Sequence, residues 1–449
     1  MKWHFIGVGG IGMSGLARLL LQKGEEVTGC DREATPLLDE LRQLGARIDL
    51  GHSPGHLEEG MQVVLSSAID PREEEVEAAR RMGLRILHRG ELLAELFRGR
   101  RGVAVAGSHG KSTTTAMTVM ALRYAGADPS FLVGARLRDL GVNAGWGQGP
   151  FLVAEVDESD GSFTWVHPEV AIITNIDDDH LDRYGTLKAM EEAFLAFAGQ
   201  ARHRVVCADD PKARRLLHEG LDGFLSYGLS DGAELKAEDV ELLPWGSRFR
   251  ALWRGRPLAE VTLRVPGEHN VKNALGALGA GLLLGLNPEA LAEGLSAYSG
   301  IGRRFEILSR EGGILVLDDY AHHPAEIRAT LSAARRLKGR RLLVVFQPHR
   351  FSRTRRLAPA FGSAFSEADH LYLLPIYSAG EAEDPAVSHQ DIARYVREEG
   401  HPPVEVWEDR EALRGHLLKV LQEGDVIVFM GAGDIGREGR LLAQALHQR

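Results

Sequence analysis

Cysteine is scarce in this chain, and its scarcity argues against two kinds of stabilising site. Only Cys30 and Cys207 occur among 449 residues, far apart and without a CxxC pair. A disulfide framework and a thiolate zinc site are therefore not expected, and a reducing, cytoplasmic location fits the composition.

Long apolar runs and an excess of positive charge are also missing. The longest apolar segment, residues 274–286, is shorter than the roughly 20 residues that a membrane span needs, and glycines interrupt it. The apolar stretch at the N-terminus is too short for a secretory signal. Asp and Glu outnumber Lys and Arg by 63 to 53, which leaves a net charge of -10. We therefore expect no membrane span and no nucleic-acid partner.

The remaining composition is typical of a globular protein, with 44% hydrophobic and 26% charged residues. The length suits about three domains of ~150 residues. Short apolar segments alternate with amphipathic helical ones, which predicts parallel βαβ units and an α/β fold. A basic stretch at 98–102, interpreted as a linker, and a glycine-containing junction at 299–302 predict domains at 1–98, 99–299 and 300–449.

Apolar segments of strand length fall into three groups, one for each predicted domain. A turn-rich, more β-like stretch with Trp245, Phe249 and Trp253 near its middle falls in the second group. The expected strands are 3–6, 26–30, 63–67 and 85–87, then 103–106, 151–155, 170–175 and 204–208, and finally 315–317, 342–346, 371–374, 404–407 and 426–430.

A first glycine loop follows the first expected strand and matches G-x-G-x-x-G. Glycines allow the backbone to approach a diphosphate, and the helix that follows offers N–H donors at its positive end. Asp31 ends the next expected strand, where a ribose-binding carboxylate is found in dinucleotide sites. The motif indicates a diphosphate and leaves NAD, FAD and a nucleotide sugar open. The motif spans residues 7–12, and its last four residues, Gly9, Gly10, Ile11 and Gly12, are the ones expected at the diphosphate.

A second loop follows the strand expected at 103–106 and ends as a P-loop does. The full G-x-x-x-x-G-K-[ST] pattern is not met, because Val105 occupies the first glycine position. Backbone N–H groups of such a loop hold phosphate, while Lys111 reaches the β and γ oxygens and the Ser112 hydroxyl ligates Mg²⁺. We therefore predict nucleoside triphosphate binding by Gly107, Ser108, His109, Gly110, Lys111, Ser112 and Thr113.

Acidic residues follow two strands that come after this loop. One strand ends in Glu155 and Asp157, and the next is followed by the run 175–182, which includes His180. Carboxylates this close repel one another unless cations lie among them, so bound Mg²⁺ is the expected compensation.

The last third places polar residues after its strands in the same way. His322 and His323 follow one strand, and His349 and Arg350 follow the next. Because ligands of parallel sheets bind beyond the carboxyl ends of the strands, this edge is expected to hold a substrate.

Taken together, these motifs resemble the Mur ligases, the ATP-dependent amide ligases of peptidoglycan assembly. They follow the order of that family over nearly the whole chain. The matching segments are HFIGVGGIGMSGLA, AGSHGKSTTT, EVDESDGSF, TNIDDDHLD, EHNVKN, GRRFE, DDYAHHPAEI, FQPHRFSRT and LPIYSAGE.

The resemblance implies three domains: a Rossmann-like domain for the UDP substrate, a P-loop ATPase-like centre and a Rossmann-like domain for the amino acid. It also implies a role for each matching residue. At the ATP site, Ser112, Glu155 and His180 would bind magnesium, His269, Asn270 and Asn273 would face the adenine, and Arg303 and Arg304 would reach the γ-phosphate. The amino acid would be handled by Tyr320, His322, His349 and Arg350. The UDP diphosphate would lie at Gly9, Gly10, Ile11, Gly12 and Asp31, with Ser66 and Ser67 beside them.

The reaction implied by the resemblance joins L-alanine to the lactyl carboxylate of UDP-N-acetylmuramate. ATP and Mg²⁺ would activate the carboxylate as an acyl phosphate, and His322 or His349 would accept the proton of the amine. Sister ligases carry a carbamylated lysine on the helix after the DHLD segment. Here that helix has only Lys188 near its start, so no carbamate is expected.

Three other functions fit parts of the sequence. The first glycine loop and Asp31 would suit an NAD-dependent oxidoreductase, which leaves the P-loop unexplained. A regulator that binds ATP without catalysis would carry the P-loop alone. A related ligase that attaches a whole tripeptide to the same sugar would share nearly all of the motifs.

Overall fold

The computed structural model describes residues 1–177 and 181–448. The described chain forms two compact units. The first comprises Met1–Asp239, Phe249–Thr262 and Val271–Tyr298, and the second comprises Val240–Arg248, Leu263–Asn270 and Ser299–Arg449. The boundaries of three domains, at residues 98 and 299, stay a prediction.

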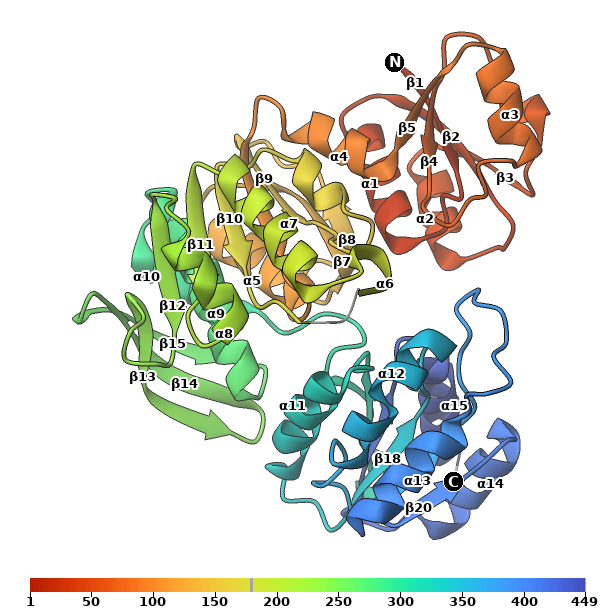
Figure 1. Ribbon diagram of the computed structural model, residues 1–449, viewed down its shortest axis with the longest axis vertical. Coiled ribbons are helices and arrows are strands. Elements are labelled where there is room, and N and C mark those ends of the chain that lie inside the picture. The colour runs from red at the N-terminus through yellow and green to blue at the C-terminus, as the bar shows by residue number, and fades with distance from the viewer. Residues whose placement is uncertain (178–180, 449) are drawn as a thin grey trace. The chain divides into compact units, whose positions relative to one another are not determined.

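The first sheet has five parallel strands in the order β3-β2-β1-β4-β5 (Figure 1). The chain runs outward from β1 to β3 and then crosses to β4, so the strand order reverses between β1 and β4. Ligands of such sheets bind at this reversal, beyond the carboxyl ends. The elements are β1 Lys2–Ile6, α1 Ile11–Gln22, β2 Glu26–Asp31, α2 Pro36–Gln43, β3 Arg47–Leu50, η1 Pro54–His56, β4 Gln62–Leu65, α3 Glu74–Arg81, β5 Arg85–His88 and α4 Arg89–Phe97.

The second sheet has ten strands, in the order β15-β14-β13-β12-β11-β10-β6-β9-β7-β8. Its central strand β6 pairs in parallel with β9 and β10, so the loop after β6 lies between the ends of two parallel neighbours. The elements are β6 Arg101–Ala106, α5 Lys111–Tyr124, β7 Ser130–Leu137, β8 Val142–Gly145, β9 Phe151–Glu155, η2 Ser162–Trp165, β10 Val170–Ile173, α6 Leu181–Tyr184, α7 Leu187–Gln200, β11 His203–Cys207, α8 Pro211–Arg215, η4 Leu216–His218, β12 Phe224–Gly228, β13 Leu235–Leu243, β14 Gly246–Trp253, β15 Arg256–Leu263, α9 Glu268–Leu283 and α10 Pro288–Ala297.

The third sheet has six strands in the order β16-β17-β21-β18-β19-β20, parallel except for β16. Helix α11 begins with Pro324 in its first turn, a position that proline favours. The elements are β16 Glu306–Ser309, η5 Glu311–Gly313, β17 Leu315–Asp319, α11 Pro324–Arg335, β18 Leu342–Phe346, α12 Phe351–Gly362, β19 His370–Leu373, α13 His389–Glu399, β20 Val404–Val406, α14 Arg410–Val420, β21 Val426–Met430 and α15 Ile435–His447.

The α/β class and the parallel sheets confirm the predicted fold, but several predicted boundaries were wrong; strand β4, for example, ends at Leu65 rather than at residue 67. Arg101 and Gly102, predicted to belong to a linker, begin strand β6. Arg101 donates two hydrogen bonds of 2.8 Å to Glu169, and a methyl group at Gly102 would lie 2.3 Å from Phe97. Strand β10 ends at Ile173 rather than Asn175, and the Thr174 hydroxyl donates to the His109 carbonyl at 2.7 Å.

Several strands were not predicted from the sequence. Most of them lack the continuous apolar run by which a buried parallel strand is recognised; β7, with Phe131, Leu132 and Val133, is the exception. In Arg47–Leu50, for example, only Ile48 is buried. The strands that were missed are β3, β7, β8, β12 and β16.

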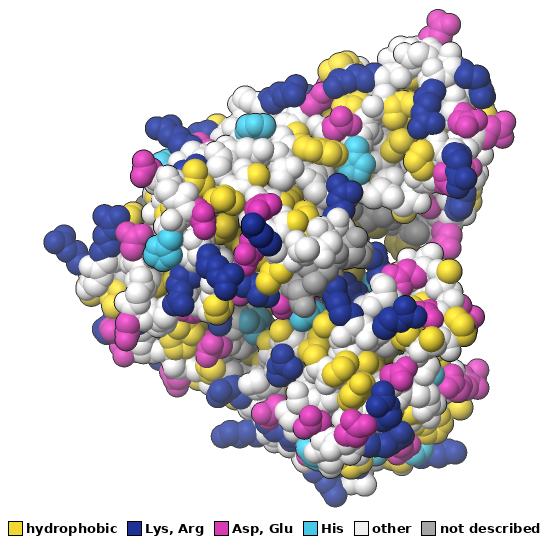
Figure 2. All heavy atoms as spheres, viewed as in Figure 1, with side chains coloured by type: hydrophobic (Ala, Val, Ile, Leu, Met, Phe, Trp, Pro, Cys, Tyr) yellow, Lys and Arg dark blue, Asp and Glu magenta, His cyan; other side chains and the backbone are white. Residues whose placement is uncertain are grey.

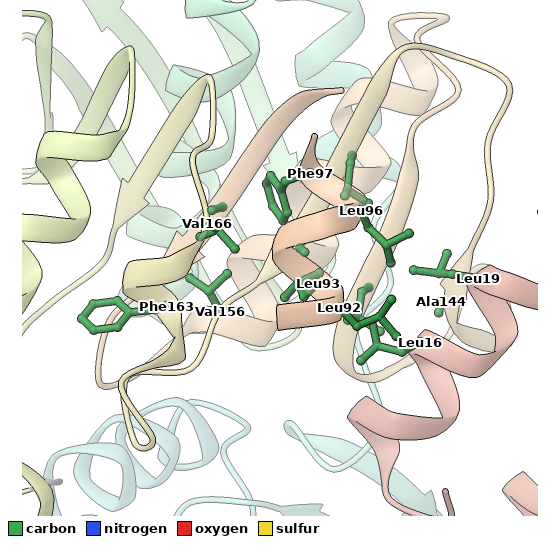
Figure 3. Close-up of a cluster of buried hydrophobic side chains, with 14 of the residues drawn as sticks. Leu16, Leu19, Leu92, Leu93, Leu96, Phe97, Ala144, Val156, Phe163 and Val166 are labelled. Carbon is green, nitrogen blue, oxygen red and sulfur yellow. The ribbon is translucent and has the colours of Figure 1, made fainter. Parts of the chain in front are cut away.

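One apolar core joins the first sheet to the second within the first unit (Figure 3). Leu16 and Leu19 of α1 and Leu92 of α4 belong to the same buried cluster as Ala144 of β8 and Phe163 of η2. This continuity fixes the first glycine loop relative to the P-loop.

Charged side chains of both signs are interspersed on the face shown in Figure 2. Both cysteines are buried and unpaired. None of the described helices is long and apolar enough to cross a bilayer.

Candidate functional site

The P-loop between β6 and α5 requires its two glycines. Gly107 and Gly110 have φ angles of 139° and 80°, in the region that side chains disfavour. A methyl group at Gly107 would lie 2.0 Å from Thr174 Oγ1, and one at Gly110 would lie 2.8 Å from Asn273 Oδ1. The backbone of the loop is therefore held close to its neighbours at both positions.

The end of β10 holds this loop in place. The His109 amide donates to Asn175 Oδ1 at 2.8 Å, and Asn175 Nδ2 donates back to the His109 carbonyl at 3.0 Å. The Asp177 amide donates to Ser108 Oγ at 2.7 Å, and the His109 ring lies 3.3 Å from the Asp177 carboxylate. Ser108 and His109 thus make contacts within the protein that order the loop.

Lys111 begins α5 and lies among carboxylates. Its Nζ donates to the Gly107 carbonyl and to Glu158 Oε1, both at 2.7 Å. Burial alone would lower the pKa of Lys111, but the charges of Glu158, Asp157 and Glu155 outweigh it and raise the pKa. The lysine is therefore fully charged, as a phosphate-binding group must be.

A cation at the start of helix α4 balances the acidic cluster. Arg89 Nη2 lies 2.7 Å from Asp157 and 2.8 Å from Asp160, and its Nε donates to Ser67 Oγ at 3.0 Å. Burial alone would raise the pKa of Asp157, but Lys111 and Arg89 lower it well below its usual range. Arg89 was not predicted as a functional residue.

The predicted magnesium ligands lie partly within the described chain. Glu155 Oε2 accepts a hydrogen bond of 2.9 Å from the Gly134 amide, and Ser112 follows Lys111 in the first turn of α5. His180 lies outside the described residues. The Ser112 hydroxyl and the carboxylates gathered near Lys111 are hard oxygen donors, the type that Mg²⁺ prefers, so this donor set fits the ion.

The first glycine loop is held by β2. The amides of Gly7 and Val8 donate to the Cys30 carbonyl at 2.9 and 3.1 Å, and the Gly9 amide donates to Asp31 Oδ2 at 2.7 Å. Asp31, predicted to lie at the UDP diphosphate, therefore hydrogen-bonds the loop itself. Gly10 is the N-cap of α1, so Ile11 and Gly12 occupy its first turn.

Ser66 and Ser67 follow β4, beside the strand-order reversal. The Ser66 amide donates to the Ile6 carbonyl at 3.3 Å, which keeps it next to the end of β1. Ser67 Oγ lies 3.3 Å from Asp160 and 3.1 Å from His88. This serine therefore belongs to the contact between the first and second sheets.

The residues predicted for the adenine side lie at the start of α9. Asn273 Oδ1 accepts from Thr114 of α5 at 3.2 Å. Asn270 Nδ2 donates to the Pro266 carbonyl at 2.7 Å, and His269 packs on Gly267. Asn273 thus touches the P-loop helix, and Asn270 and His269 each contact the segment before α9.

Aromatic rings gather in the second unit, beyond the ends of β17 and β18. The His322 ring lies 5.5 Å from the Tyr320 ring and 5.9 Å from the His349 ring. His349 stacks on Tyr377 at 5.7 Å, and the Arg350 amide donates to the Tyr377 carbonyl at 2.8 Å. The structure thus brings together the four residues predicted to handle the amino acid.

The two histidines differ in which ring nitrogen carries the proton. His322 Nδ1 lies 3.0 Å from the Tyr320 carbonyl, an acceptor, so Nδ1 carries the proton and Nε2 the lone pair of the neutral ring. His349 Nδ1 lies 2.9 Å from Arg353 Nη1, a donor, so this nitrogen accepts and Nε2 carries the proton.

The predicted phosphate-binding arginines flank Tyr320. The guanidinium groups of Arg303 and Arg304 lie 4.9 and 5.2 Å from the Tyr320 ring centre. Arg303 has a φ angle of 59°, a conformation held by hydrogen bonds from its amide to Glu306 and from its side chain to the Gly431 carbonyl. Such a backbone persists only where its surroundings fix it.

Family models cover most of the chain. A model described as "Mur ligase family, catalytic domain" matches residues 2–101, "Mur ligase middle domain" matches 105–281, and "Mur ligase, glutamate ligase domain" matches 303–433. Curated relatives match over the full length. A UDP-N-acetylmuramate–L-alanine ligase of Oleidesulfovibrio alaskensis is 45% identical over 441 residues, which is 97% of each chain. The chain belongs to the Mur ligase family.

Other Mur ligases agree with this assignment. The UDP-N-acetylmuramate–L-alanine ligase of Geobacter sulfurreducens is 43% identical over 453 residues, 100% of this chain and 98% of that one. The crystal structure of UDP-N-acetylmuramate–alanine ligase from Thermotoga maritima superposes with a TM-score of 0.85 at 29% identity, covering 100% and 99% of the two chains. The crystal structure of a murein peptide ligase from Psychrobacter arcticus superposes with a TM-score of 0.73 at 26% identity, and it too covers 100% of this chain and 99% of that one.

As a Mur ligase the protein is an ATP-dependent ligase, so the predicted enzyme class is confirmed. The oxidoreductase and the non-catalytic regulator are thereby excluded. Sequence reasoning missed Arg89 and gave Glu158 no role. Both follow the carboxyl end of a parallel strand, and that position was the signal that could have found them.

Proposed function

We propose that this Mur ligase joins L-alanine to the lactyl carboxylate of UDP-N-acetylmuramate in peptidoglycan precursor synthesis. Support comes from the full-length curated relatives of 40–45% identity that bear this activity in their names. The observation that carries the proposal is the charged P-loop lysine, held between the Gly107 carbonyl and Glu158.

Phosphoryl transfer from ATP to the lactyl carboxylate forms an acyl phosphate and ADP. This step depends on positioning and charge neutralisation. Lys111 would leave its contact with Glu158 to bind the phosphates, and Gly107 and Gly110 would let the backbone amides approach them. Ser112, Glu155 and His180 would hold Mg²⁺, which neutralises charge on the phosphate oxygens. Arg303 and Arg304 would supply further positive charge.

The amine of alanine must lose a proton to attack the acyl phosphate. We assign this base to His322, because its Nε2 carries the lone pair of the neutral ring. His349 has Nδ1 occupied by Arg353 and its proton on Nε2, which suits a donor to the alanine carboxylate. Collapse of the tetrahedral intermediate then gives the amide and inorganic phosphate.

A phosphate-release assay tests the proposed activity. The enzyme is given ATP, Mg²⁺ and UDP-N-acetylmuramate with L-alanine, L-serine, glycine or the tripeptide substrate of the sister ligase. Release is expected with L-alanine, and the product mass should equal that of the sugar nucleotide plus alanine minus water. Release with the tripeptide in place of alanine would assign the protein to the murein peptide ligases.

A further inference from the structure

A second group of metal-ligating side chains lies in the first sheet, apart from the P-loop. Its members come from β1, β2, η1 and α3, elements separated by up to 71 residues. Three of the side chains are fully buried, and the imidazole from η1 is 16% exposed. The members of this His–Cys–Glu cluster are His4, Cys30, His56 and Glu75.

The ligand atoms already have almost the spacing of a metal site. All four lie within 4.8 Å of one another. Glu75 Oε1 is 3.0 Å from His4 Nε2 and 2.9 Å from His56 Nδ1, and Glu75 Oε2 is 3.1 Å from Cys30 Sγ. Cys30 Sγ is 3.8 Å from His4 Nε2. In a tetrahedral zinc site with bonds of ~2.0–2.3 Å, ligand atoms are roughly 3.3–3.8 Å apart.

A neighbouring hydroxyl orients His4 as a ligand. Thr28 Oγ1 donates to the Trp3 carbonyl at 3.3 Å and lies 2.7 Å from His4 Nδ1, so it accepts the Nδ1 proton. His4 Nε2, which hydrogen-bonds Glu75 Oε1 at 3.0 Å, is then the nitrogen that would bind a metal once its own proton is displaced. A second hydrogen bond of this kind accompanies most metal-bound histidines, because it fixes the tautomer and the ring plane.

Charge balance also favours a cation. Glu75 is fully buried, and its two oxygens contact His4, His56 and Cys30, so a carboxyl group lies inside the cluster. The Cys30 thiol donates a hydrogen bond of 3.1 Å to Glu75 Oε2. A divalent ion would displace that proton, and with one thiolate, one carboxylate and two neutral imidazoles the site would be electrically neutral.

We propose that the His–Cys–Glu cluster binds one divalent transition-metal ion of the zinc class. The two imidazoles, the thiolate and the carboxylate are the four ligands. As the metal binds, the thiol proton leaves to solvent, and each ligating imidazole nitrogen gives up the proton that it shares with Glu75, by release to solvent or by moving to the other ring nitrogen. His52 Nδ1, 3.2 Å from Cys30 Sγ, supports the sulfur from outside this set. No such site was predicted from the sequence, because the chain has no CxxC pair. The fold instead assembles the four ligands from four separate elements, a placement that no local sequence pattern shows.

The site would stabilise the first glycine loop. The Cys30 carbonyl accepts the amides of Gly7 and Val8, so a metal on its side chain would anchor the strand that holds the loop. Metal binding energy would appear as folding energy of the first unit.

Cobalt and zinc test this site on the full chain without recourse to activity. Protein stripped with a chelator and dialysed is titrated with Co²⁺ alone, then with Zn²⁺. We expect one equivalent of Co²⁺ to give a thiolate-to-cobalt charge-transfer band in the near ultraviolet and intense tetrahedral bands in the visible. Zn²⁺ should abolish them and raise the melting temperature by several degrees.

Matched variants decide the ligands. Cys30→Ser should lose the charge-transfer band, whereas Cys207→Ser, which alters the other buried cysteine, should keep it. His56→Gln changes a partly exposed turn residue and should fold; it should weaken Zn²⁺ binding more than about tenfold. No band in the parent protein, the same band in Cys30→Ser, or unchanged Zn²⁺ affinity in His56→Gln would overturn the proposal.

Discussion

Single side chains in this protein owe their chemistry to their buried neighbours. Burial alone would favour the neutral form of Lys111, but three nearby carboxylates raise its pKa and keep it charged. Burial would likewise favour the neutral form of Asp157, but Lys111 and Arg89 lower its pKa and keep it charged. The P-loop region is thus an ion cluster in which each charge depends on the others. Removing one member of this ion cluster should therefore change both the affinity for ATP and the free energy of unfolding.

Replacing Lys111 tests the phosphate role. Lys111→Ala should lower ATP-dependent phosphate release by about 1000-fold or more, because the main cation at the phosphates is lost. Binding of the UDP substrate, measured by calorimetry, should change little. Lys188→Ala is the matched control: Lys188 is 84% exposed on α7, and we predict that it carries no carbamate. Full activity of Lys111→Ala would contradict the assigned role.

Replacing the two histidines separates base from binding group. His322→Gln should lower kcat by about 100-fold or more, with partial recovery at high pH where free alanine loses its own proton. His349→Gln should mainly raise KM for alanine. Steady-state kinetics across pH measures both effects, and the opposite pattern would exchange the two roles.

Asp318 gives the second unit a pH-dependent stability. Its burial raises its pKa to about 6, although Arg303 and Arg440 lie nearby. The native state therefore holds this proton more tightly than the unfolded chain does. The resulting contribution of Asp318 to the unfolding free energy is complete below about pH 4 and is lost as the pH rises through about 6. A shift of two units corresponds to at most about 3 kcal/mol.

Asp318→Asn should remove part of this pH dependence. The difference in unfolding free energy between about pH 4.5 and 7.5 should shrink by about 1–3 kcal/mol, as measured by denaturant titration. Asp369→Asn offers a control, because Arg335 and the Leu342 amide lower the pKa of Asp369 despite its burial; this carboxyl titrates below pH 3.8, so the slope between about pH 4.5 and 7.5 should stay unchanged. An unchanged slope in Asp318→Asn would show that this carboxyl titrates normally.

At the level of elements, small residues and loops set how the sheets meet. Helix α1 lies against β7 and β8, where a methyl group on Gly15 would lie 2.3 Å from Leu132 and 2.9 Å from Asn143. Asn143 in turn donates to the Ile11 carbonyl at 2.8 Å. The first sheet is therefore positioned on the second by a close approach that only glycine permits.

A larger residue at this contact should separate the two sheets. Gly15→Val should lower the unfolding free energy by about 2–3 kcal/mol, because the well-packed neighbours must shift. It should also lower activity by displacing the first glycine loop. Gly199→Ala, on α7 with open space around it, should leave stability unchanged or slightly higher. Calorimetry and kinetics on both variants check this, and a neutral Gly15→Val would refute the contact.

At the level of the whole chain, the two units have separate cores. The first is centred on the cluster that contains Leu16 and Phe163, and the second on two clusters on opposite faces of the third sheet, around Phe346 and Phe429. A domain with its own core can unfold on its own.

We therefore expect two transitions in scanning calorimetry. Gly15→Val should lower only one transition temperature, and Asp318→Asn should shift only the other. A nonhydrolysable ATP analogue with Mg²⁺ should raise the transition that Gly15→Val lowers, because Lys111 lies in that unit. One cooperative transition that both variants shift equally would mean that the units unfold together.

The sequence by itself determined the α/β class, the P-loop and the order of the motifs, because apolar periodicity and glycine spacing are local properties. Tertiary structure decided which distant residues meet. Arg89 reaches Asp157 across 68 residues, and His4 reaches Glu75 across 71, contacts that no local pattern encodes. The protonated nitrogen of His322 was also settled only by the fold, because a tautomer depends on whether the facing atom is a donor or an acceptor.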